Sequence, residues 1–188
     1  MESDLLGEIQ VPKDAYYGVQ TLRGLYNYNI TGVRLSSYRN FIKAFGMIKK
    51  ACIIANGRLG LIKKEIVDAV SQACDEVIEG KLDKEFVVDM IQGGAGTSTN
   101  MNANEVIANR ALEILGKEKG DYTTVSPNDH INKCQSTNDT YPSSGKLGMY
   151  LDHFELVAEL EKLIEAFEKK AEEFKDVLKM GRTQLQDA

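Results

Sequence analysis

Apolar residues recur at helical spacing over two stretches in the first half of the chain. Between residue 38 and about residue 55 they fall every three or four positions, which is typical of one face of an α-helix. Asn56-Gly57 is a turn-forming pair, so we expect this helix to end there. A second apolar stripe runs from Ile62 to Val77, and Gly80 should stop that helix. The stripe of the first helix consists of Phe41, Ile42, Phe45, Ile48 and Cys52.

The rest of the first two thirds carries weaker patterns. Residues 1–36 read as extended and irregular, with short strands possible, because glycines, tyrosines and Pro12 interrupt any helical period. A short helix is expected around residues 86–91. The segment from the glycine run at 93–96 to about Leu115 is apolar nearly all round, which indicates a buried helix. Residues 116–127 form a polar loop.

The last third predicts one long amphipathic helix from Pro142 to about Lys179. Pro142 would fit its first turn, where a missing N–H costs nothing. The helix would span roughly 57 Å at 1.5 Å per residue, which is too long for a small compact domain. Its apolar stripe needs partner helices. We therefore expect an all-α fold: a mainly helical N-terminal domain with minor short strands (1–138), and the start of a central helical bundle (139–188).

Composition and charge narrow the possible partners. The 188 residues are 43% hydrophobic and 27% charged, with a net charge of −5. The acidic balance argues against a nucleic-acid partner, and no apolar run approaches the length of a membrane span. The start lacks a secretory signal pattern, so a cytoplasmic protein is expected. Three scattered cysteines, Cys52, Cys74 and Cys134, with only two histidines, favour reduced thiols and disfavour a zinc site.

Three clusters of small polar residues interrupt the helical pattern, at 94–102, 128–139 and 181–184. The first two precede predicted helices, whose free N–H groups and positive dipole end can hold an anion. The hydroxyls of Thr97, Ser136 and Thr137 would add neutral donors, which suits carboxylate recognition. Simple N-capping with turn glycines explains each cluster alone about as well. A phosphate-binding loop is disfavoured because the sequence contains neither G-x-x-x-x-G-K-[ST] nor G-x-G-x-x-G.

Two reactive side chains lie in the second cluster. Cys134 has no identifiable base beside it, so a small buried residue is the better interpretation than a nucleophile. His130 could act as an acid or base, and a hydrogen-bonded structural histidine explains it equally well.

Four segments together resemble the aspartase/fumarase superfamily, in the right order and over essentially the whole chain. They are YYGVQT at 16–21, GGAGTSTNMNANEVIANRA at 93–111, NDHINKCQSTNDTYPS at 128–143 and GRTQLQDA at 181–188. The resemblance implies an all-α homotetramer whose aspartase branch removes ammonia from L-aspartate and leaves fumarate. A base would take the C3 proton, and no metal or organic cofactor would be required.

The resemblance also implies roles for six residues of this chain as substrate-binding groups. Thr97 would lie near the amino or carboxylate group of the substrate. Ser136, Thr137 and Asn138 would hold carboxylate oxygens, and Thr183 and Gln184 would contact the substrate from another side. The family's loop of the form GSSxMPxKxN, which supplies a serine base, does not occur in these 188 residues. We therefore expect that base beyond residue 188, and no catalysis by this chain alone.

Fumarase is the close alternative. Fumarases have GTQSN where this chain has residues 96–100, SSN where it has 136–138, and histidine in place of Ser126 and Gln184. Each difference favours the aspartase branch. The alternative from outside the enzymes is a non-catalytic helical assembly module that keeps ancestral motifs.

The predicted helix length has a consequence for the active site. If the helix is continuous, Ser136 before it and Thr183 after it would be about 55 to 60 Å apart. One chain could not bring both to one substrate. We therefore expect active sites that are shared between the subunits of an oligomer.

Overall fold

The computed structural model describes residues 1–187. It divides into two compact units, residues 1–151 and the residues from 152 onward, and each is described by itself. The first unit holds four helices and the beginning of a fifth. The second holds the rest of that helix and a short hairpin.

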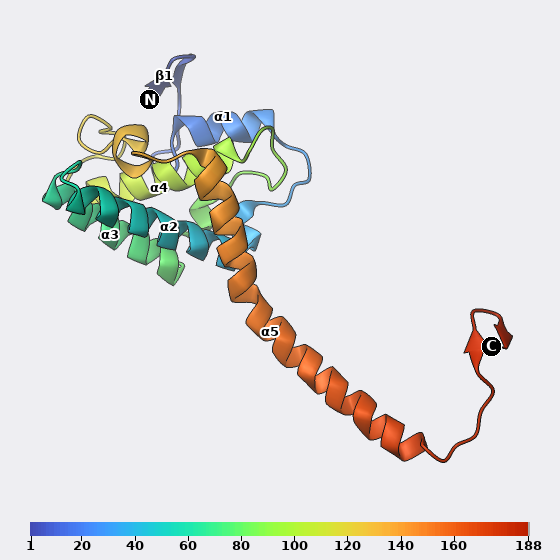
Figure 1. Ribbon diagram of the computed structural model, residues 1–188. Helices are drawn as coiled ribbons and strands as arrows, with labels where there is room; N and C mark the ends of the chain where they lie inside the picture. The colour runs from blue at the N-terminus through green and yellow to red at the C-terminus, as the bar shows by residue number, and fades with distance from the viewer. Residues whose placement is uncertain (188) are drawn as a thin grey trace. The chain divides into compact units, whose positions relative to one another are not determined.

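In the first unit, each α-helix packs against one or two of the others. α2 (Arg39–Arg58) packs against α3 (Lys64–Glu79), α3 against α4 (Thr97–Ile114), and α4 against α1 (Val19–Asn27) (Figure 1). The fifth helix, α5, covers Thr137–Phe174. Helices thus dominate, and the prediction of an all-α, mainly helical fold is confirmed.

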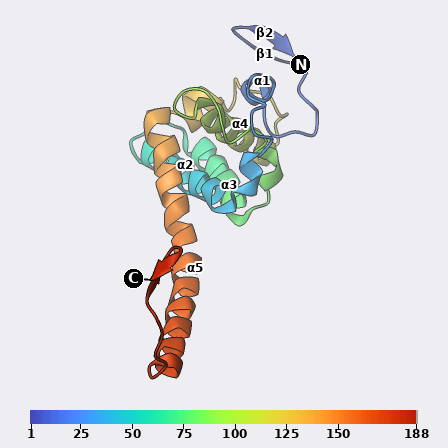
Figure 2. The same cartoon turned by 90° about the vertical axis from the view of Figure 1, so that its right-hand side faces the viewer.

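The strands are few and short, as the sequence allowed. β1 (Glu2–Asp4) and β2 (Gly7–Ile9) form an antiparallel hairpin in which Glu2 lies opposite Ile9. Figure 2 shows this hairpin beside α1. In the second unit, β3 (Arg182–Thr183) pairs with β4 (Gln186–Asp187).

α1 is the helix that the sequence did not predict. Its N-terminus has no local side-chain cap. Instead, the buried carboxylate of Glu105, on α4, accepts hydrogen bonds from the N–H groups of Gly18, Gln20 and Thr21 at 2.8 to 3.0 Å. A carboxylate at this position satisfies the free N–H groups and complements the positive dipole end. The cap lies 87 residues from Gly18 along the chain, so a local pattern could not reveal it.

α2 differs from its prediction in length and in its buried face. The helix continues through Asn56-Gly57 to Arg58. A side chain at Gly57 would place its Cβ 2.7 Å from the Val67 side chain, so glycine here allows α3 to approach α2 and does not form a turn. The buried stripe is also rotated: Ile48 and Cys52 are only half-buried, and the fully buried positions include Ile42, Phe45, Lys49 and Ile53.

α3 matches its prediction closely. It ends at Glu79, and Gly80 adopts a left-handed backbone with φ +89°. The N–H of Gly80 donates to the carbonyl of Val77 at 3.1 Å, which satisfies one of the last carbonyls of the helix.

The helix expected at residues 86–91 is not present. A single 3₁₀ turn, Asp83–Glu85, is followed by non-helical backbone with one isolated bridge, between Asp89 and Arg34. Val88 O accepts from Leu35 N and Phe86 O accepts from Ser36 N, each at 2.9 Å, so the segment pairs with residues 33–36 as a strand would. A short buried apolar run suits a strand as well as a helix, and only its partner decides between them.

α4 is buried nearly all round, as predicted, and its buried face includes polar residues. Asn102 accepts from Val87 N at 3.0 Å and donates to Glu85 O at 2.9 Å. Asn109 donates to Tyr16 O at 2.8 Å and accepts from Gly120 N at the same distance. These amides therefore hold the surrounding loops to the central helix.

α5 is continuous from Thr137 to Phe174, so the predicted long helix is confirmed with shifted ends. Pro142 is its sixth residue and does not lie in the first turn as predicted, because the helix begins in the polar cluster before it. Proline donates no N–H, so the carbonyl of Asn138 lacks its usual helical partner. The stripe is exposed at Phe154, Val157, Leu160, Ile164, Phe167 and Phe174.

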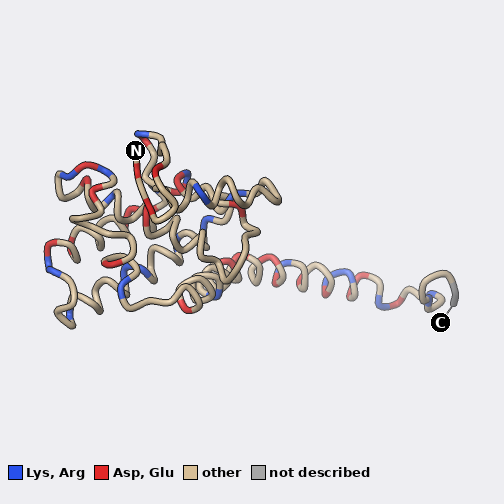
Figure 3. The backbone as a smooth tube through the Cα atoms, turned by 90° about the horizontal axis from the view of Figure 1, so that it is seen from above, with Lys and Arg blue, Asp and Glu red and all other residues tan. Residues whose placement is uncertain are grey.

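Charge is distributed along the whole backbone. Figure 3 shows basic and acidic residues interspersed over the helices and loops. Across residues 1–187, none of the helices has both the length and the apolar character needed to cross a bilayer.

Candidate functional site

The first polar cluster forms the start of α4. Gly94 and Gly96 both have left-handed backbones, with φ +74° and +84°. We expected a hydroxyl or amide side chain to cap this helix, but its N-cap is Gly96 and no side chain caps it. The reason is space: a Cβ at Gly96 would lie 2.2 Å from the ring of Tyr141. Thr97, the first residue of α4, is exposed.

The second polar cluster forms the start of α5. Ser136 Oγ accepts a hydrogen bond from Asn138 N at 3.1 Å, and Ser136 O accepts from Asp139 N and Thr140 N at 3.0 Å. Ser136 thus caps α5 in the way that small polar residues commonly do. Ser136 and Asn138 are exposed, and Thr137 is half-buried.

The starts of α4 and α5 lie side by side. Asn100, one turn into α4, donates from Nδ2 to Thr137 Oγ1 at 3.2 Å, and its Oδ1 accepts from Thr140 Oγ1 at 3.1 Å. Tyr141 packs on Gly96 from the same side. Two helix N-termini with their hydroxyl groups therefore lie next to each other, so that two positive dipole ends are close together.

A group of side chains behind this contact was missed by sequence reasoning. Lys49 of α2 is fully buried and donates to Asn132 Oδ1 at 3.0 Å and to Gln135 Oε1 at 2.9 Å. Burial lowers the pKa of Lys49 to about 7, against the smaller opposing influence of Cys52 and Cys74. The signal in the sequence was a lysine four residues after Phe45, inside an apolar helical stripe.

Thr97 also lines an open groove of about 860 Å³. Met101 and Glu105 of α4, Gln20 of α1, and Ser126 and Asn128 of the following loop lie along the same groove. The groove therefore continues from the start of α4 toward the beginning of the second cluster.

The loop before α5 contains a single π-helical turn, Pro127–Ile131. His130 Nδ1 accepts a hydrogen bond from Ser126 N at 2.9 Å, and partial burial lowers the pKa of His130. These contacts favour the structural interpretation of this histidine over an acid or base. Ser126 Oγ in turn accepts from Asp129 N at 3.0 Å, so it caps the turn.

The expected burial of Cys134 is wrong. The residue is exposed and has a left-handed backbone with φ 58°. It lies in the short turn between the π-helical turn and α5, and its side chain is exposed. The three cysteines are free thiols.

Thr183 and Gln184 belong to the second unit. Thr183 is in β3 and Gln184 begins the turn to β4 with φ 45°, and both side chains are exposed. Ala188, the last residue of the family-like segment at 181–188, lies outside the described residues.

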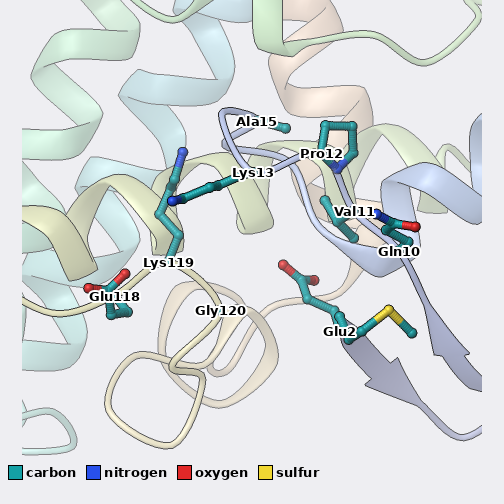
Figure 4. A pocket seen from close by; sticks show the side chains of 10 residues that line it. Glu2, Gln10, Val11, Pro12, Lys13, Ala15, Glu118, Lys119 and Gly120 are labelled. Carbon is teal, nitrogen blue, oxygen red and sulfur yellow. The ribbon is translucent and has the colours of Figure 1, made fainter.

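Two further kinds of site could carry chemistry: a metal site and a second pocket. Within residues 1–187, no group of three His, Cys, Asp or Glu side chains could hold a metal ion. A hollow of about 510 Å³ near the N-terminus has Lys13 and Lys119 on one side and Glu2 on the other (Figure 4). Its mixed charges do not select an anion or a cation, and the predicted binding residues do not line it.

A family model described as lyase matches residues 7–188. The chain therefore belongs to this lyase family.

Several relatives match over the full chain. Aspartate ammonia-lyases from Pseudomonas aeruginosa and Helicobacter pylori are 55% and 54% identical over 188 residues, and the one from Escherichia coli is 52% identical over 189 residues. In each case the match covers 100% of this chain and 40% of the relative. The chain thus spans about 40% of the length of these curated relatives.

Solved structures agree with this assignment. The fumarate lyase:delta crystallin from Brucella melitensis in native form superposes with a TM-score of 0.93 at 51% identity, covering all of this chain and 42% of that one. The class II fumarase from Schistosoma mansoni gives a TM-score of 0.88 at 39% identity, with 39% of that chain covered.

Proposed function

We propose that the whole protein containing this chain is an aspartate ammonia-lyase that converts L-aspartate to fumarate and ammonia. The observation that carries the proposal is the meeting of the α4 and α5 starts, where Asn100 Nδ2 contacts Thr137 Oγ1 at 3.2 Å. Two helix N-termini and uncharged hydroxyls suit a dicarboxylate. The names of the relatives add support for L-aspartate as the substrate.

The reaction requires three events. A base removes a proton from C3, the electron pair is delocalised into the adjacent carboxylate, and the C–N bond breaks to release ammonia. Stabilising the doubled negative charge is the main catalytic task. We assign the base to a serine outside residues 1–188. Gln184 cannot be a base or acid near neutral pH, because an amide does not ionise there.

The six binding residues keep the roles that the resemblance implies. In this proposal Thr97 lies near the amino or carboxylate group, and Ser136, Thr137 and Asn138 hold carboxylate oxygens. The exposure of Thr97, Ser136 and Asn138 supports this, because their polar groups remain available to a ligand. Thr183 and Gln184 approach the substrate from another side.

The proposed assembly is a cytoplasmic homotetramer with shared active sites. Residues 1–138 would form the N-terminal lyase domain, and residues 139–188 would begin the central helical bundle. Two features support the assembly: the 38 continuous residues of α5 separate the second cluster from the third, and the helix carries exposed apolar residues that need partners. The three free thiols fit a reducing compartment.

The function can be tested by following the ultraviolet absorbance of fumarate in the whole protein. L-aspartate should be converted and L-malate should not. Thr137→Val should raise KM for L-aspartate about tenfold, because one donor to a charged carboxylate is lost. Thr123→Val, in an exposed loop, is the matched control and should leave KM unchanged.

Two outcomes would contradict the proposal. Turnover of L-malate with no turnover of L-aspartate would identify a fumarate hydratase. No turnover of either, with no binding of a dicarboxylate, would favour the non-catalytic assembly module.

A further inference from the structure

Lys49 is a buried lysine whose described hydrogen-bond partners are neutral side-chain amides. Its side chain is 0% exposed in the middle of α2. Nζ donates to Asn132 Oδ1 at 3.0 Å and to Gln135 Oε1 at 2.9 Å. Burying the charged form of a lysine is costly. Here Nζ contacts two amide oxygens of the loop before α5, and an apolar side chain would fill the same space without that cost. Packing alone therefore does not explain why a lysine is at this position.

Asn132 Oδ1 is the point where several donors converge. Besides Lys49, it accepts from Asn100 Nδ2 at 3.0 Å and from Asn104 Nδ2 at 3.3 Å. The other end of the same amide, Asn132 Nδ2, donates to the carbonyl of Gln135 at 3.3 Å. Turning the Asn132 amide over would place its NH₂ group against three donors and lose every one of these bonds. With the three donors placed as they are, only the oxygen of the Asn132 amide can face them.

The orientation is set at Lys49, whose Nζ donates to Asn132 Oδ1 and to Gln135 Oε1. The oxygen of Asn132 is therefore directed toward α2, and this oxygen accepts a hydrogen bond from the NH₂ group of Asn100. With its NH₂ group so directed, Asn100 presents its second N–H to Thr137 Oγ1 at 3.2 Å. Its own oxygen accepts from Thr140 Oγ1 at 3.1 Å.

The consequence falls on Thr137. Its oxygen accepts from Asn100, so its hydroxyl proton is directed elsewhere, and a hydroxyl that accepts one bond becomes a stronger donor. Without the orienting chain, Asn100 could present its carbonyl oxygen to Thr137. The hydroxyl proton would then point inward and only lone pairs would face an anion.

We propose that Lys49 is a positioning residue that acts through Asn132 and Asn100 to make the Thr137 hydroxyl a donor to the substrate carboxylate. The inference rests on the proposed function for the identity of the substrate. The orienting chain itself consists of contacts within residues 1–151 and can be tested separately.

A double-mutant cycle on the whole protein tests the link to binding. Affinity for succinate, a dicarboxylate without the amine, would be measured by calorimetry for Lys49→Met, Thr137→Val and the double variant. Each single change should weaken binding about tenfold, since each removes the same donor. In the Thr137→Val background, Lys49→Met should have less than about a twofold further effect. Equal losses in both backgrounds would overturn the proposal.

Lys50→Met is the matched control. Lys50 is the next residue of α2 and pairs with Asp75 on the surface at 2.6 Å, away from the amides. Its loss should change succinate affinity by less than about twofold.

If Lys49→Met does not fold, Asn132 supplies a second test. Asn132→Asp keeps an acceptor for the three donors and should retain succinate affinity, whereas Asn132→Leu should weaken it about tenfold. Equal affinities for these two variants would contradict the orienting chain.

An NMR measurement on the whole protein separates this inference from the proposed function. Lys49→Met should shift the side-chain amide NMR signals of Asn100 and Asn132, and Lys50→Met should not. If the whole protein fails to act on L-aspartate, the proposed function is wrong, and these signals still decide on the orienting chain. If L-aspartate is converted but the Asn100 signals do not respond to Lys49→Met, the inference alone is wrong.

Discussion

Gly94 and Gly96 adopt the same left-handed backbone but differ in what surrounds them. A Cβ at Gly94 would meet open space, whereas one at Gly96 would lie 2.2 Å from the Tyr141 ring. Gly94→Ala should therefore cost only the left-handed penalty of about 1 to 2 kcal/mol. Gly96→Ala should cost roughly 1 to 3 kcal/mol more, because Tyr141 must move. Urea unfolding measures both, and equal losses would show that Tyr141 does not pack on Gly96.

Asp89 makes the free energy of unfolding depend on pH in the acid range. Burial raises the pKa of its carboxyl, but hydrogen bonds from the N–H groups of Ile91, Thr31 and Gly32 and from the Thr31 hydroxyl lower it to about 2, below the ordinary 3.8. A carboxyl with a lowered folded pKa stabilises the fold above its unfolded pKa, and this stabilisation is lost as the pH falls from about 4 toward 2.

Asp89→Asn should therefore reduce the free energy of unfolding at pH 7, and the difference from the unsubstituted chain should shrink as the pH approaches 3. Denaturant unfolding at several pH values measures this. Asp14→Asn is the control, because Asp14 is exposed. A loss that stays constant down to pH 3 would show that the charge of Asp89 does not contribute.

At the scale of elements, α1 depends on a carboxylate from α4. Glu105 Oε2 accepts from Gly18 N, Thr21 N and Thr21 Oγ1, and Oε1 accepts from Gln20 N. Burial raises the pKa of Glu105, and these four donors act in the opposite direction. Glu105 thus ties the start of α1 to α4, in addition to the packing of its buried residues Val19 and Leu22.

Glu105→Gln should destabilise α1 selectively. The amide offers one oxygen where the carboxylate offers two, and its NH₂ group would face an N–H donor, at a cost of about 2 to 3 kcal/mol. Hydrogen exchange should show faster exchange at residues 19–27 than in α3. Glu118→Gln, an exposed change, should not alter exchange. Uniform acceleration over all helices would mean that Glu105 supports the whole fold and not α1 in particular.

At the scale of the whole molecule, the proposal of shared active sites makes the assembly necessary for function. The two halves of the proposed binding set are Thr97 with residues 136–138, and Thr183 with Gln184. They come before and after the exposed apolar stripe of α5, which would pack against partner helices in a bundle.

Complementation tests this sharing in the whole protein. Ser136→Ala and Thr183→Ala should each lower turnover of L-aspartate when alone. After dissociation and reassociation together, mixed tetramers should regain part of the activity, because some sites then draw both intact residues from different subunits. A Ser136→Ala, Thr183→Ala double variant mixed with either single variant should recover nothing. No recovery in mixtures with proven subunit exchange would count against shared sites.

The sequence by itself determined the elements whose evidence is local. The apolar periods of α3, α4 and α5 predicted those helices, because a buried stripe repeats every three to four residues in any fold. The polar clusters also marked the two helix starts that meet, since glycines and small hydroxyl residues have strong local preferences there. The family was recognisable from the same segments.

The tertiary structure alone decided what depends on partners distant in the chain. Glu105 caps α1, residues 86–90 pair with residues 33–36, and Asn132 and Gln135 accept the hydrogen bonds of the buried Lys49. Local propensity is too weak to foresee such outcomes, since a distant hydrogen bond or contact can outweigh it. The polar groups of a segment must find hydrogen-bond partners. Which conformation satisfies them therefore depends on what lies beside the segment: a carboxylate, an amide oxygen or another stretch of backbone.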